Sequence, residues 1–497
     1  MSGSPVRIVH VVPQLSLGGA GRALIGLVKF SSRFGNYEHQ ILSLQKPDQR
    51  AVELAAPTGA RVLTLLKGEA PEILNAADIV QFHFWNTPEL HLLLNADLPK
   101  MRSVIWLHIN GAYPPQSITA NVCTVGDIIV ASDFGSLHIP ALKEIPSKLQ
   151  LIVPGTDPRR LDGYTSIDHA TFNVGYIGTL SFSKMHPEFV AMHAAALDIS
   201  AIRIVVYGEG HAADALKRQC KQLGVDHRFE FRGYAEDIRE ALGELDVFGY
   251  PLCETNYSTG ELVLQEAMLA GIPPIVLPFG GAANRVIHRN TGLVAQDVRG
   301  YSEAIAFLYN NPVLRARLGT AANDYARKEF SAETTALKFN MIYSDLMKKP
   351  KRHHHFPADG THQYAAANGA SLFVSSLRDI HIDFAASLSP DGGTAAIAAE
   401  ARISSAAPHL FETLMQYRGC FPDDPSLRFW SGLLLHALGR PALAASEFSR
   451  AVSLGYDHWR IHWHLAKAAR AAGSDERASA AFAQAKVSAL SQGITLE

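Results

Sequence analysis

The chain has 497 residues, of which 47% are hydrophobic and 19% charged, and its formal net charge is −2. This length predicts two to four domains with large cores, and the near-neutral charge excludes a protein-wide attraction to nucleic acid. The four cysteines form no Cys-x-x-Cys pair, which argues against a disulfide framework or a structural zinc site. We see no secretory signal and no membrane-spanning run, so we expect a cytoplasmic protein, with peripheral contact at the inner face of the membrane left open.

Residues 1–155 alternate short apolar runs with helical patterns, starting with a run at residues 6–13 that a glycine turn and a helix follow. Six more apolar runs lie at residues 39–44, 61–66, 78–84, 103–108, 127–132 and 149–155. Runs this short are typical of parallel strands that helices cover on both faces. The alternation predicts β-α-β units in one doubly wound sheet.

The same pattern begins again in residues 156–347. Strands are predicted at residues 172–180, 202–210, 229–234, 246–252 and 273–278, and residues 312–347 are strongly helical. The sequence thus predicts an α/β fold with two Rossmann-like domains facing a cleft. Ligands of such sheets bind at the carboxyl ends of the strands, so we expect a ligand between the two domains.

The composition changes after residue 347. Residues 348–360 are basic, contain proline and carry three adjacent histidines, His353, His354 and His355, and residues 361–405 are rich in Ala, Ser and Gly. We interpret 348–405 as a linker or weakly structured segment. Contact with an anionic membrane and a metal site at the histidines are the alternatives.

Residues 406–497 contain a repeat with a period of 34 residues. Five positions keep their register: Gly432, Gly439, Ala444, Phe448 and Ala451 recur as Ala466, Gly473, Ala478, Phe482 and Ala485. The period and spacing resemble the tetratricopeptide repeat, a helix–turn–helix unit, and an Ala-rich helical hairpin is the alternative. Two units rarely bury their own faces, so we expect support from a neighbouring segment, a protein partner or self-association.

Several residues that follow predicted strands are candidates for a ligand site. Gly18 and Gly19 allow backbone amides at a helix start to approach a phosphate, although a plain turn explains them equally well. Lys184, in the loop after the first strand of the second domain, can neutralise a diphosphate, unless it is an ordinary surface lysine. His108 and His83 both end strands, and the sequence does not choose between them or between a buried role and a cleft-facing one.

The stretch from Ser258 to Gly271 has two carboxylates. Ser258 and Glu261 fit the Ser-x-x-Glu capping box at a helix start. Glu266 lies about 140° further round the helix, in an apolar run where a carboxylate needs hydrogen-bond donors. Ribose hydroxyls are suitable donors, and the amides of Thr259 and Gly260 can meet phosphate. The stretch thus predicts both a helix start and a grip on a nucleoside diphosphate.

Five motifs follow one another in a characteristic order: GGAGR (18–22), PGTD (154–157), GTLSFSK (178–184), YGEG (207–210) and EAMLAGIPPIV (266–276). On these motifs, residues 6–347 resemble the GT-B-fold glycosyltransferases of the retaining family 4 type. The resemblance implies transfer of a hexosyl group from a nucleotide sugar to a carbohydrate or lipid-linked acceptor with retention, in polysaccharide or glycoconjugate biosynthesis. It implies no cofactor, and the chain contains no Asp-x-Asp that would hold a metal ion.

The resemblance also implies roles for individual residues. Glu266 matches the glutamate that binds the donor ribose, Lys184 the lysine on the diphosphate, and His108 the histidine beside the donor sugar. Gly18 and Gly19 match the glycine loop near the sugar phosphate. The chain departs from the family at two positions in this site: Ser258 stands where the first of two glutamates is expected, and Thr179 stands where a basic residue is expected. Glu261 either replaces the missing glutamate or only caps the helix.

Two other classes of function stay open at this stage. A degenerate donor domain could serve as an interaction protein that binds partners through its repeats. An epimerase or a phosphorylase acting on the same fold is the other alternative, although no signature of a phosphorylase cofactor lysine is visible.

Overall fold

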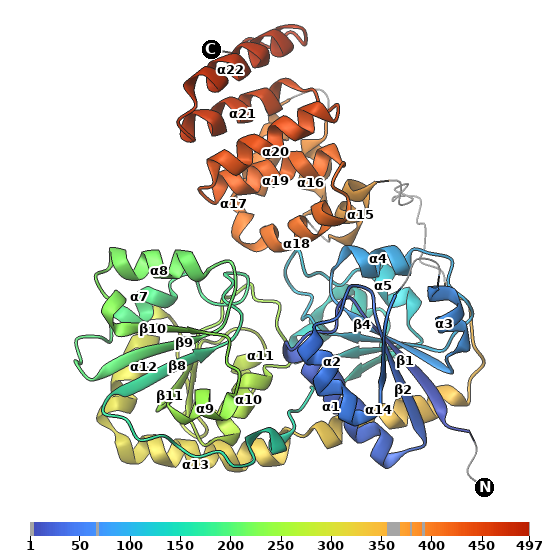
Figure 1. Ribbon diagram of the computed structural model, residues 1–497, viewed down its shortest axis with the longest axis vertical. Coiled ribbons are helices and arrows are strands. Elements are labelled where there is room, and N and C mark those ends of the chain that lie inside the picture. The colour runs from blue at the N-terminus through green and yellow to red at the C-terminus, as the bar shows by residue number, and fades with distance from the viewer. Residues whose placement is uncertain (1–3, 66–68, 355–367, 378–379, 390–392, 497) are drawn as a thin grey trace. The chain divides into compact units, whose positions relative to one another are not determined.

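The computed structural model describes residues 4–65, 69–354, 368–377, 380–389 and 393–496 (Figure 1). The chain forms two compact units. The first unit consists of residues 1–84, 99–113 and 126–354, and the second of residues 85–98, 114–125 and 355–497. The division differs from the expected one, because two segments of the predicted first domain group with the C-terminal region.

The first unit contains a seven-stranded sheet in which all neighbouring strands are parallel. Its order is β3 (Arg61–Thr64), β2 (Tyr37–Ser43), β1 (Val6–Val12), β4 (Ile79–Phe84), β5 (Ser103–Leu107), β6 (Ile128–Ala131) and β7 (Leu149–Leu151). These are the seven predicted strands. The direction of winding reverses between β1 and β4, which is where such sheets bind ligands.

Two long helices pack together on one face of this sheet, α1 (Gly19–Phe34) and α14 (Ala332–Met347). Phe30 from α1 and Phe339 and Tyr343 from α14 form a core cluster with Trp106 of β5. The last helix of the second Rossmann-like domain therefore completes the first one. The shorter elements of this half are α2 (Gln49–Ala55), η1 (Ala56–Thr58), α3 (Ala70–Ala76), η2 (Phe134–His138) and α6 (Pro140–Lys143).

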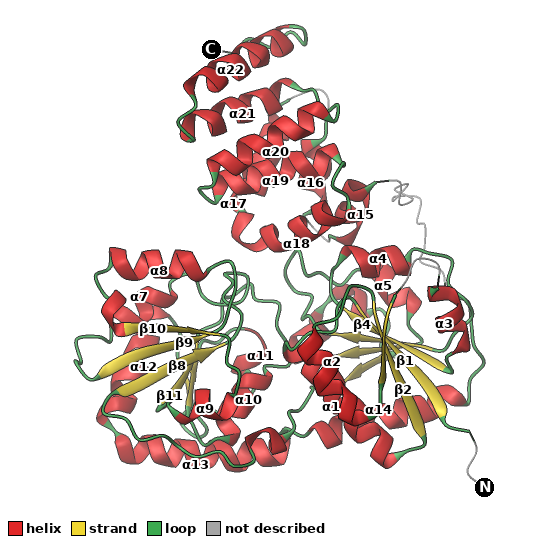
Figure 2. Cartoon of the chain, in the orientation of Figure 1, coloured by secondary structure: helices red, strands yellow, loops and turns green. Residues whose placement is uncertain are grey.

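The second sheet of the first unit is six-stranded and also parallel throughout (Figure 2). Its order is β10 (Phe229–Gly233), β9 (Ile202–Tyr207), β8 (Phe172–Ile177), β11 (Val247–Tyr250), β12 (Pro274–Val276) and β13 (Leu293–Val294). The winding reverses between β8 and β11. The two-residue strand β13 was not predicted, because so short a strand leaves no periodicity in the sequence.

Helices flank this second sheet. They are η3 (Pro158–Leu161), α7 (Phe189–Ala194), α8 (Ala213–Gln222), η4 (Asp226–Arg228), α9 (Ile238–Gly243), α10 (Leu262–Leu269), α11 (Gly280–Ala283), α12 (Val298–Asn310) and α13 (Pro312–Glu329). The two sheets with their helices confirm the predicted pair of Rossmann-like domains.

The second unit is helical in its described residues. Its helices are α4 (Pro88–Leu94), α5 (Ala120–Val125), α15 (Gly369–Ser376), α16 (His381–Ser387), α17 (Thr394–Ser405), α18 (Ala407–Cys420), α19 (Pro425–Ala437), α20 (Pro441–Ser453), α21 (Trp459–Ala471) and α22 (Asp475–Leu490). Three helices between residues 369 and 405 correct the expectation of weak structure there.

The start of the expected linker is also ordered: the backbones of Arg352 and Met101 exchange hydrogen bonds, and His354 lies 3.4 Å from the Asp127 carboxylate. Residues 355–367, including His355, lie outside the described residues. The metal and membrane alternatives for the three histidines therefore stay predictions.

The sequence repeat coincides with two helical hairpins, α19–α20 and α21–α22. A Cβ on Gly432 would lie 2.5 Å from the Phe448 ring, so the small residue of the repeat is needed where the aromatic one packs. Gly439 and Gly473 end the first helix of each hairpin with positive φ angles of 71° and 77°, a conformation that favours glycine. The hairpins are observed, and the assignment to the tetratricopeptide class stays a prediction.

A buried amide ties the inserted segments to the C-terminal helices within the second unit. Asn86 donates from Nδ2 to Pro115 O at 2.6 Å and to Ser376 Oγ at 2.9 Å, and its Oδ1 accepts from the Tyr417 hydroxyl at 2.8 Å. Residues 85–98, 114–125 and the C-terminal region therefore share a set of buried hydrogen bonds, and removal of one partner leaves a buried polar atom unsatisfied.

Among the residues that Figure 1 draws as ribbon, no helix is long and apolar enough to cross a membrane.

The Asn86 network predicts a specific loss of stability. Tyr417→Phe leaves the buried Asn86 oxygen without this donor, so the free energy of unfolding measured in denaturant should fall by about 1–3 kcal/mol. Tyr456→Phe is the matched control, because its hydroxyl lies 3.5 Å from Ser387 O and makes only a long contact. Equal losses in the two variants would contradict this account of how the second unit is held together.

Candidate functional site

Four charged side chains gather where strands of the first unit end. Asp133 follows β6, Lys184 follows β8, Glu261 precedes α10 and Arg285 follows α11. We call these four residues the buried charge cluster. Asp133, Glu261 and Arg285 are only 2%, 5% and 3% exposed, so their charges are out of water and depend on one another.

Glu261 does not cap a helix in the predicted way. Helix α10 begins at Leu262, Glu261 itself is the N-cap with a left-handed φ of 47°, and no side chain caps the helix there. Ser258 instead donates its hydroxyl to Asn256 Oδ1 at 3.0 Å. The capping-box prediction is therefore wrong. The carboxylate accepts from the Tyr250 hydroxyl at 2.7 Å and lies 3.8 Å from Lys184 Nζ, so tertiary partners hold it.

Arg285 is the central cation of the cluster. Its Nη1 lies 4.0 Å from Asp133 Oδ2, and its Nη2 donates to Thr259 O at 2.5 Å. The guanidinium also donates to Gly281 O. A Cβ on Gly281 would come within 2.8 Å of Arg285, Thr259 and Asp133, so only glycine fits at this position.

The cluster leaves two carboxylate oxygens without donors. Asp133 Oδ2 and Glu261 Oε1 are buried and accept no hydrogen bond from any residue that the structure describes. Burial raises the pKa of Asp133 against the opposing effect of Arg285, and the charge of Glu261 raises it further. Burial, and next Glu261, raise the pKa of Tyr250 well above its usual value. A buried oxygen without a donor costs free energy that a hydroxyl-bearing ligand can return.

Glu266 lies on α10 and is buried, as expected for a carboxylate that needs donors. Its Oε1 accepts from the Thr156 hydroxyl at 3.2 Å and forms an ion pair with Arg160. Burial, and next the charge of Arg22, lower the pKa of the Arg160 guanidinium to about 9. The hydrogen-bond donors of Glu266, which the sequence alone did not identify, thus come from the segment between β7 and β8. We call this segment, which connects the two sheets, the crossing segment.

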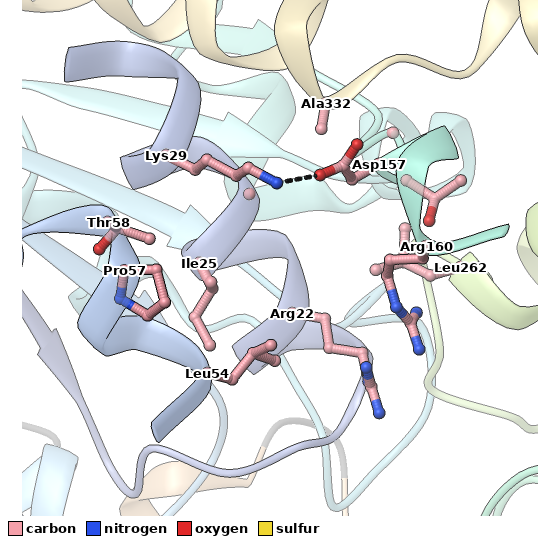
Figure 3. Close-up of a pocket in the computed structure, with 13 residues that line it drawn as sticks. Arg22, Ile25, Lys29, Leu54, Pro57, Thr58, Asp157, Arg160, Leu262 and Ala332 are labelled. Atoms are coloured by element: carbon pink, nitrogen blue, oxygen red, sulfur yellow. Dashed lines mark hydrogen bonds and ion pairs between the residues drawn. The ribbon is translucent and has the colours of Figure 1, made fainter. Parts of the chain in front are cut away.

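Arg160 of this ion pair also lines a cavity of about 210 Å³ (Figure 3). Its charged lining consists of Arg22 and Lys29 from α1 and of Asp157 and Arg160 from the crossing segment, and Lys29 Nζ lies 2.6 Å from Asp157. The remaining lining is Ile25, Gly26, Leu54, Pro57, Thr58, Gly155, Thr156, Leu262 and Ala332. The cavity therefore carries three cations and one anion, which suits an anionic ligand.

The predicted glycine loop stands at the start of α1. Gly18 is the N-cap and Gly19 the first helical residue. A Cβ on Gly19 would meet no heavy atom within 4 Å, so packing in the protein does not require a glycine there. The open space leaves the backbone accessible to a ligand.

His108 and His83 lie next to each other, so they are parts of one arrangement. His108 Nε2 is 2.9 Å from His83 Nδ1, and the His108 carbonyl accepts from Thr259 Oγ1 at 3.3 Å. Burial lowers the pKa of His108 to about 3. His108 is the nearer of the two to the segment that leads into α10.

Other predicted residues lie near the cluster without a specific role visible in the protein alone. Thr179 is exposed, and its carbonyl accepts from the Tyr176 hydroxyl at 3.0 Å. Gly260 accepts at its carbonyl from Gln265 Nε2 at 2.8 Å.

Asp133, Arg160 and Arg285 were missed by sequence reasoning. Asp133 directly follows a predicted strand, and that position was a signal that could have been used. Arg160 lies in η3 and Arg285 just after α11, and neither directly follows a predicted strand.

Comparison with known proteins connects this geometry to a family. Residues 171–311 match the family described as Glycosyl transferases group 1. The N-acetyl-alpha-D-glucosaminyl L-malate synthase of Bacillus anthracis is 24% identical over 151 residues, 30% of this chain and 39% of the relative. A GDP-mannose-dependent alpha-mannosyltransferase of Mycolicibacterium smegmatis is 33% identical over 150 residues, 30% and 37% of the two chains. The chain thus spans about two fifths of the length of the curated relatives it matches.

Solved structures extend the similarity to both sheets. The Anabaena protein HepE, solved with UDP and glucose, superposes with a TM-score of 0.57 at 17% identity, over 68% of this chain and all of that one. Sucrose-phosphate synthase from Thermosynechococcus elongatus superposes with a TM-score of 0.53 at 16% identity, over 69% and 99%. These similarities confirm the predicted fold class: two Rossmann-like domains of the GT-B type, followed by a helical region.

The buried charge cluster predicts the effect of removing its central cation. Arg285→Gln leaves Asp133 without its counter-charge and Glu261 with Lys184 alone, and should cost about 3–5 kcal/mol of unfolding free energy. Arg299→Gln is the control, because its side chain is 88% exposed and its pair with Glu303 contributes little.

Adding Asp133→Asn to the Arg285→Gln variant should restore part of the lost stability, since it removes one of the unpaired charges. An Arg285→Gln variant as stable in denaturant as Arg299→Gln would contradict this description of the cluster.

Proposed function

We propose that this protein is a glycosyltransferase that moves a hexosyl group from a nucleotide-diphosphate sugar to an acceptor, with retention of anomeric configuration. The observation that carries the proposal is a pair of buried carboxylate oxygens, on Asp133 and Glu261, that lie near the carboxyl ends of strands and receive no hydrogen bond from the described residues. Sugar hydroxyls are donors of the right kind. The family match over residues 171–311 and the sugar-nucleotide names of the relatives support it.

The donor would lie across the start of α10. Glu266 is the proposed ribose ligand, and a carboxylate that already binds Thr156 and Arg160 still has lone pairs for a ribose hydroxyl. Lys184 is the proposed cation on the diphosphate, and the backbone of Gly18 and Gly19 is the proposed glycine loop near the sugar phosphate. Ser258, Thr259 and Gly260 form the remaining donor-binding loop, and His108 contacts the sugar.

Glu261 would take over the role of the first of the family's two glutamates, whose position Ser258 occupies in this chain. Its carboxylate already lies within 3.8 Å of Lys184 and keeps one buried oxygen without a donor. The left-handed backbone at Glu261 is uncommon for a residue other than glycine, and such strain concentrates at functional sites.

The proposed chemistry is the one that the resemblance to the retaining glycosyltransferases implies. The acceptor hydroxyl attacks the anomeric carbon from the face that the diphosphate leaves, and the leaving oxygen takes the acceptor's proton. The protein contributes orientation and charge stabilisation, the latter from Lys184 and the amides at the start of α1. We propose that the reaction needs no metal cofactor, since the chain has no Asp-x-Asp motif.

The acceptor is proposed to be a carbohydrate or a lipid-linked saccharide, in polysaccharide or glycoconjugate biosynthesis. A lipid-linked acceptor would bring the protein to a membrane surface. The hairpins within 406–497 are proposed to bind a protein partner or a second copy of the chain.

An interaction protein with a decayed donor site and a nucleotide-sugar epimerase are the alternatives. Thr179 and Ser258 are the features that favour a decayed site. Sugar transfer that requires an acceptor separates the proposed activity from epimerisation, and binding of a nucleoside diphosphate separates it from a decayed site.

The first test is thermal stabilisation by UDP, GDP, ADP, dTDP and their sugars. One of these series should raise the melting temperature, and Glu266→Gln should weaken binding about 10- to 100-fold, because a hydrogen bond to a charged group is lost. Glu303→Gln, an exposed carboxylate on α12, is the control and should bind as the wild type does.

Stabilisation by none of the nucleotides, or equal binding by both glutamate variants, would overturn the proposed donor site.

A further inference from the structure

Four buried histidines form a continuous row of hydrogen bonds across the first sheet. His39 Nδ1 lies 2.8 Å from His10 Nε2, His10 Nδ1 lies 3.1 Å from His83 Nε2, and His83 Nδ1 lies 2.9 Å from His108 Nε2. They come in this order from β2, β1, β4 and the residue after β5. We call them the histidine row.

Strand register explains why the four rings meet. His39 pairs with Ile8 of β1, two residues before His10. Val11 pairs with Phe82, which places His83 two residues beyond His10 along the sheet, and Phe84 pairs with Leu107, which places His108 two further. A step of two residues keeps side chains on the same face of a pleated sheet. The row therefore runs diagonally on one face, toward the carboxyl ends of the strands.

The row lies in apolar surroundings that keep it uncharged. Trp106 packs against both His83 and His108, and Tyr343 of α14 lies near His39. Burial lowers the pKa of His39 to about 4 and that of His108 to about 3, and it holds those of His10 and His83 well below their usual value. Each neutral imidazole then carries one N–H and one lone pair.

The end of the row away from the site decides which nitrogen carries the proton. Asn340 Nδ2 donates to the Ser31 carbonyl at 3.2 Å, which fixes the orientation of its amide, because a carbonyl only accepts. Ser31 therefore donates its single hydroxyl hydrogen to Asn340 Oδ1, at 2.5 Å. The contact of 3.0 Å between Ser31 Oγ and His39 Nε2 then requires His39 to be the donor.

One contact, between Gln81 and His83, is inconsistent with this direction of donation, but it is longer than the contacts that support it. The Gln81 amide nitrogen lies 3.5 Å from His83 Nε2, where two donors would face each other. At 3.5 Å this contact is too long to outweigh the Ser31–Asn340 bond. An amide flip places the Gln81 oxygen there instead, and the Tyr343 hydroxyl, 2.6 Å from the amide, can accept as well as donate.

We infer that His39, His10 and His83 are positioning residues that fix His108 as the Nε2–H tautomer, so that Nδ1 of His108 is a hydrogen-bond acceptor. Each ring donates from Nε2 to Nδ1 of the next, from His108 down to His39 and on to Ser31. Where the proposed function brings the sugar to Nδ1 of His108, the group that meets this nitrogen must be a donor, such as a hydroxyl. The tautomer rests on the structure alone, whereas the identity of the ligand rests on the proposed function.

Ring nitrogen resonances of the full-length protein labelled with ¹⁵N-histidine test the tautomers directly. All four rings of the row should show a protonated Nε2 and an unprotonated Nδ1 at neutral pH. His193 is an internal control of opposite kind, because its Nδ1 lies 2.7 Å from the Phe189 carbonyl and must donate. A protonated Nδ1 on any ring of the row overturns the inference.

A variant at the far end of the row tests whether the effect travels to His108. Ser31→Ala removes the acceptor of His39, so the His108 resonances should shift toward the other tautomer. Ser32→Ala, the next residue on α1, should leave them unchanged, since the Ser32 hydroxyl donates to the Val28 carbonyl of the same helix at 3.2 Å. His108 resonances in Ser31→Ala identical to those of the wild type overturn the positioning role.

Binding connects the row to the proposed function. In whichever of the UDP, GDP, ADP and dTDP series stabilises the wild type, Ser31→Ala should weaken binding of the nucleotide sugar about 2- to 10-fold and leave binding of the nucleoside diphosphate unchanged, because only the sugar meets His108. Equal losses for both compounds overturn the assignment of His108 to the sugar. A wild type that shows the expected tautomers but binds none of the UDP, GDP, ADP and dTDP compounds supports the positioning role and overturns the proposed donor instead.

Discussion

Two carboxylates, Asp133 and Glu261, are buried where strands of the two sheets end. Arg285 lies 4.0 Å from Asp133 and donates a hydrogen bond to the carbonyl of Thr259. A charge out of water is tolerated only with counter-charges and donors around it. The nearby structure follows from this requirement: Gly281 leaves room for Arg285, Tyr250 donates to Glu261, and the chain passes through a left-handed residue before α10 begins.

The same burial prepares the site for a ligand. Two carboxylate oxygens lack donors in the described part of the chain, and the cation of Lys184 lies 3.8 Å from the Glu261 carboxylate. A molecule with hydroxyls at one end and phosphates at the other satisfies both conditions. Preorganised groups of this kind bind without paying for reorganisation, which is how such sites favour a developing charge. The histidine row adds to this preorganisation, because its hydrogen bonds connect α1 and α14 to His108 at the edge of the site.

The strands were predictable because each is a short apolar run, and parallel topology then places loops such as those before Lys184 and Glu261 at one edge. Local patterns failed where distant residues decide the structure. The Ser258–Glu261 spacing fits a capping box, yet Tyr250 and Lys184 attract the carboxylate away from the helix start. The partners of Glu266 come from a segment about 110 residues earlier, which no local pattern contains. Helices between residues 369 and 405 were missed because Ala/Ser-rich sequence has weak amphipathic periodicity.

The most direct test compares the affinity of a nucleotide sugar with that of the matching nucleoside diphosphate by calorimetry, in the wild type and in Glu261→Gln. If the buried carboxylates await sugar hydroxyls, the sugar adds to the affinity of the wild type, and Glu261→Gln removes most of that gain while leaving diphosphate binding within a few-fold. A wild type that binds both compounds equally well, or a gain that survives Glu261→Gln in full, would contradict the account.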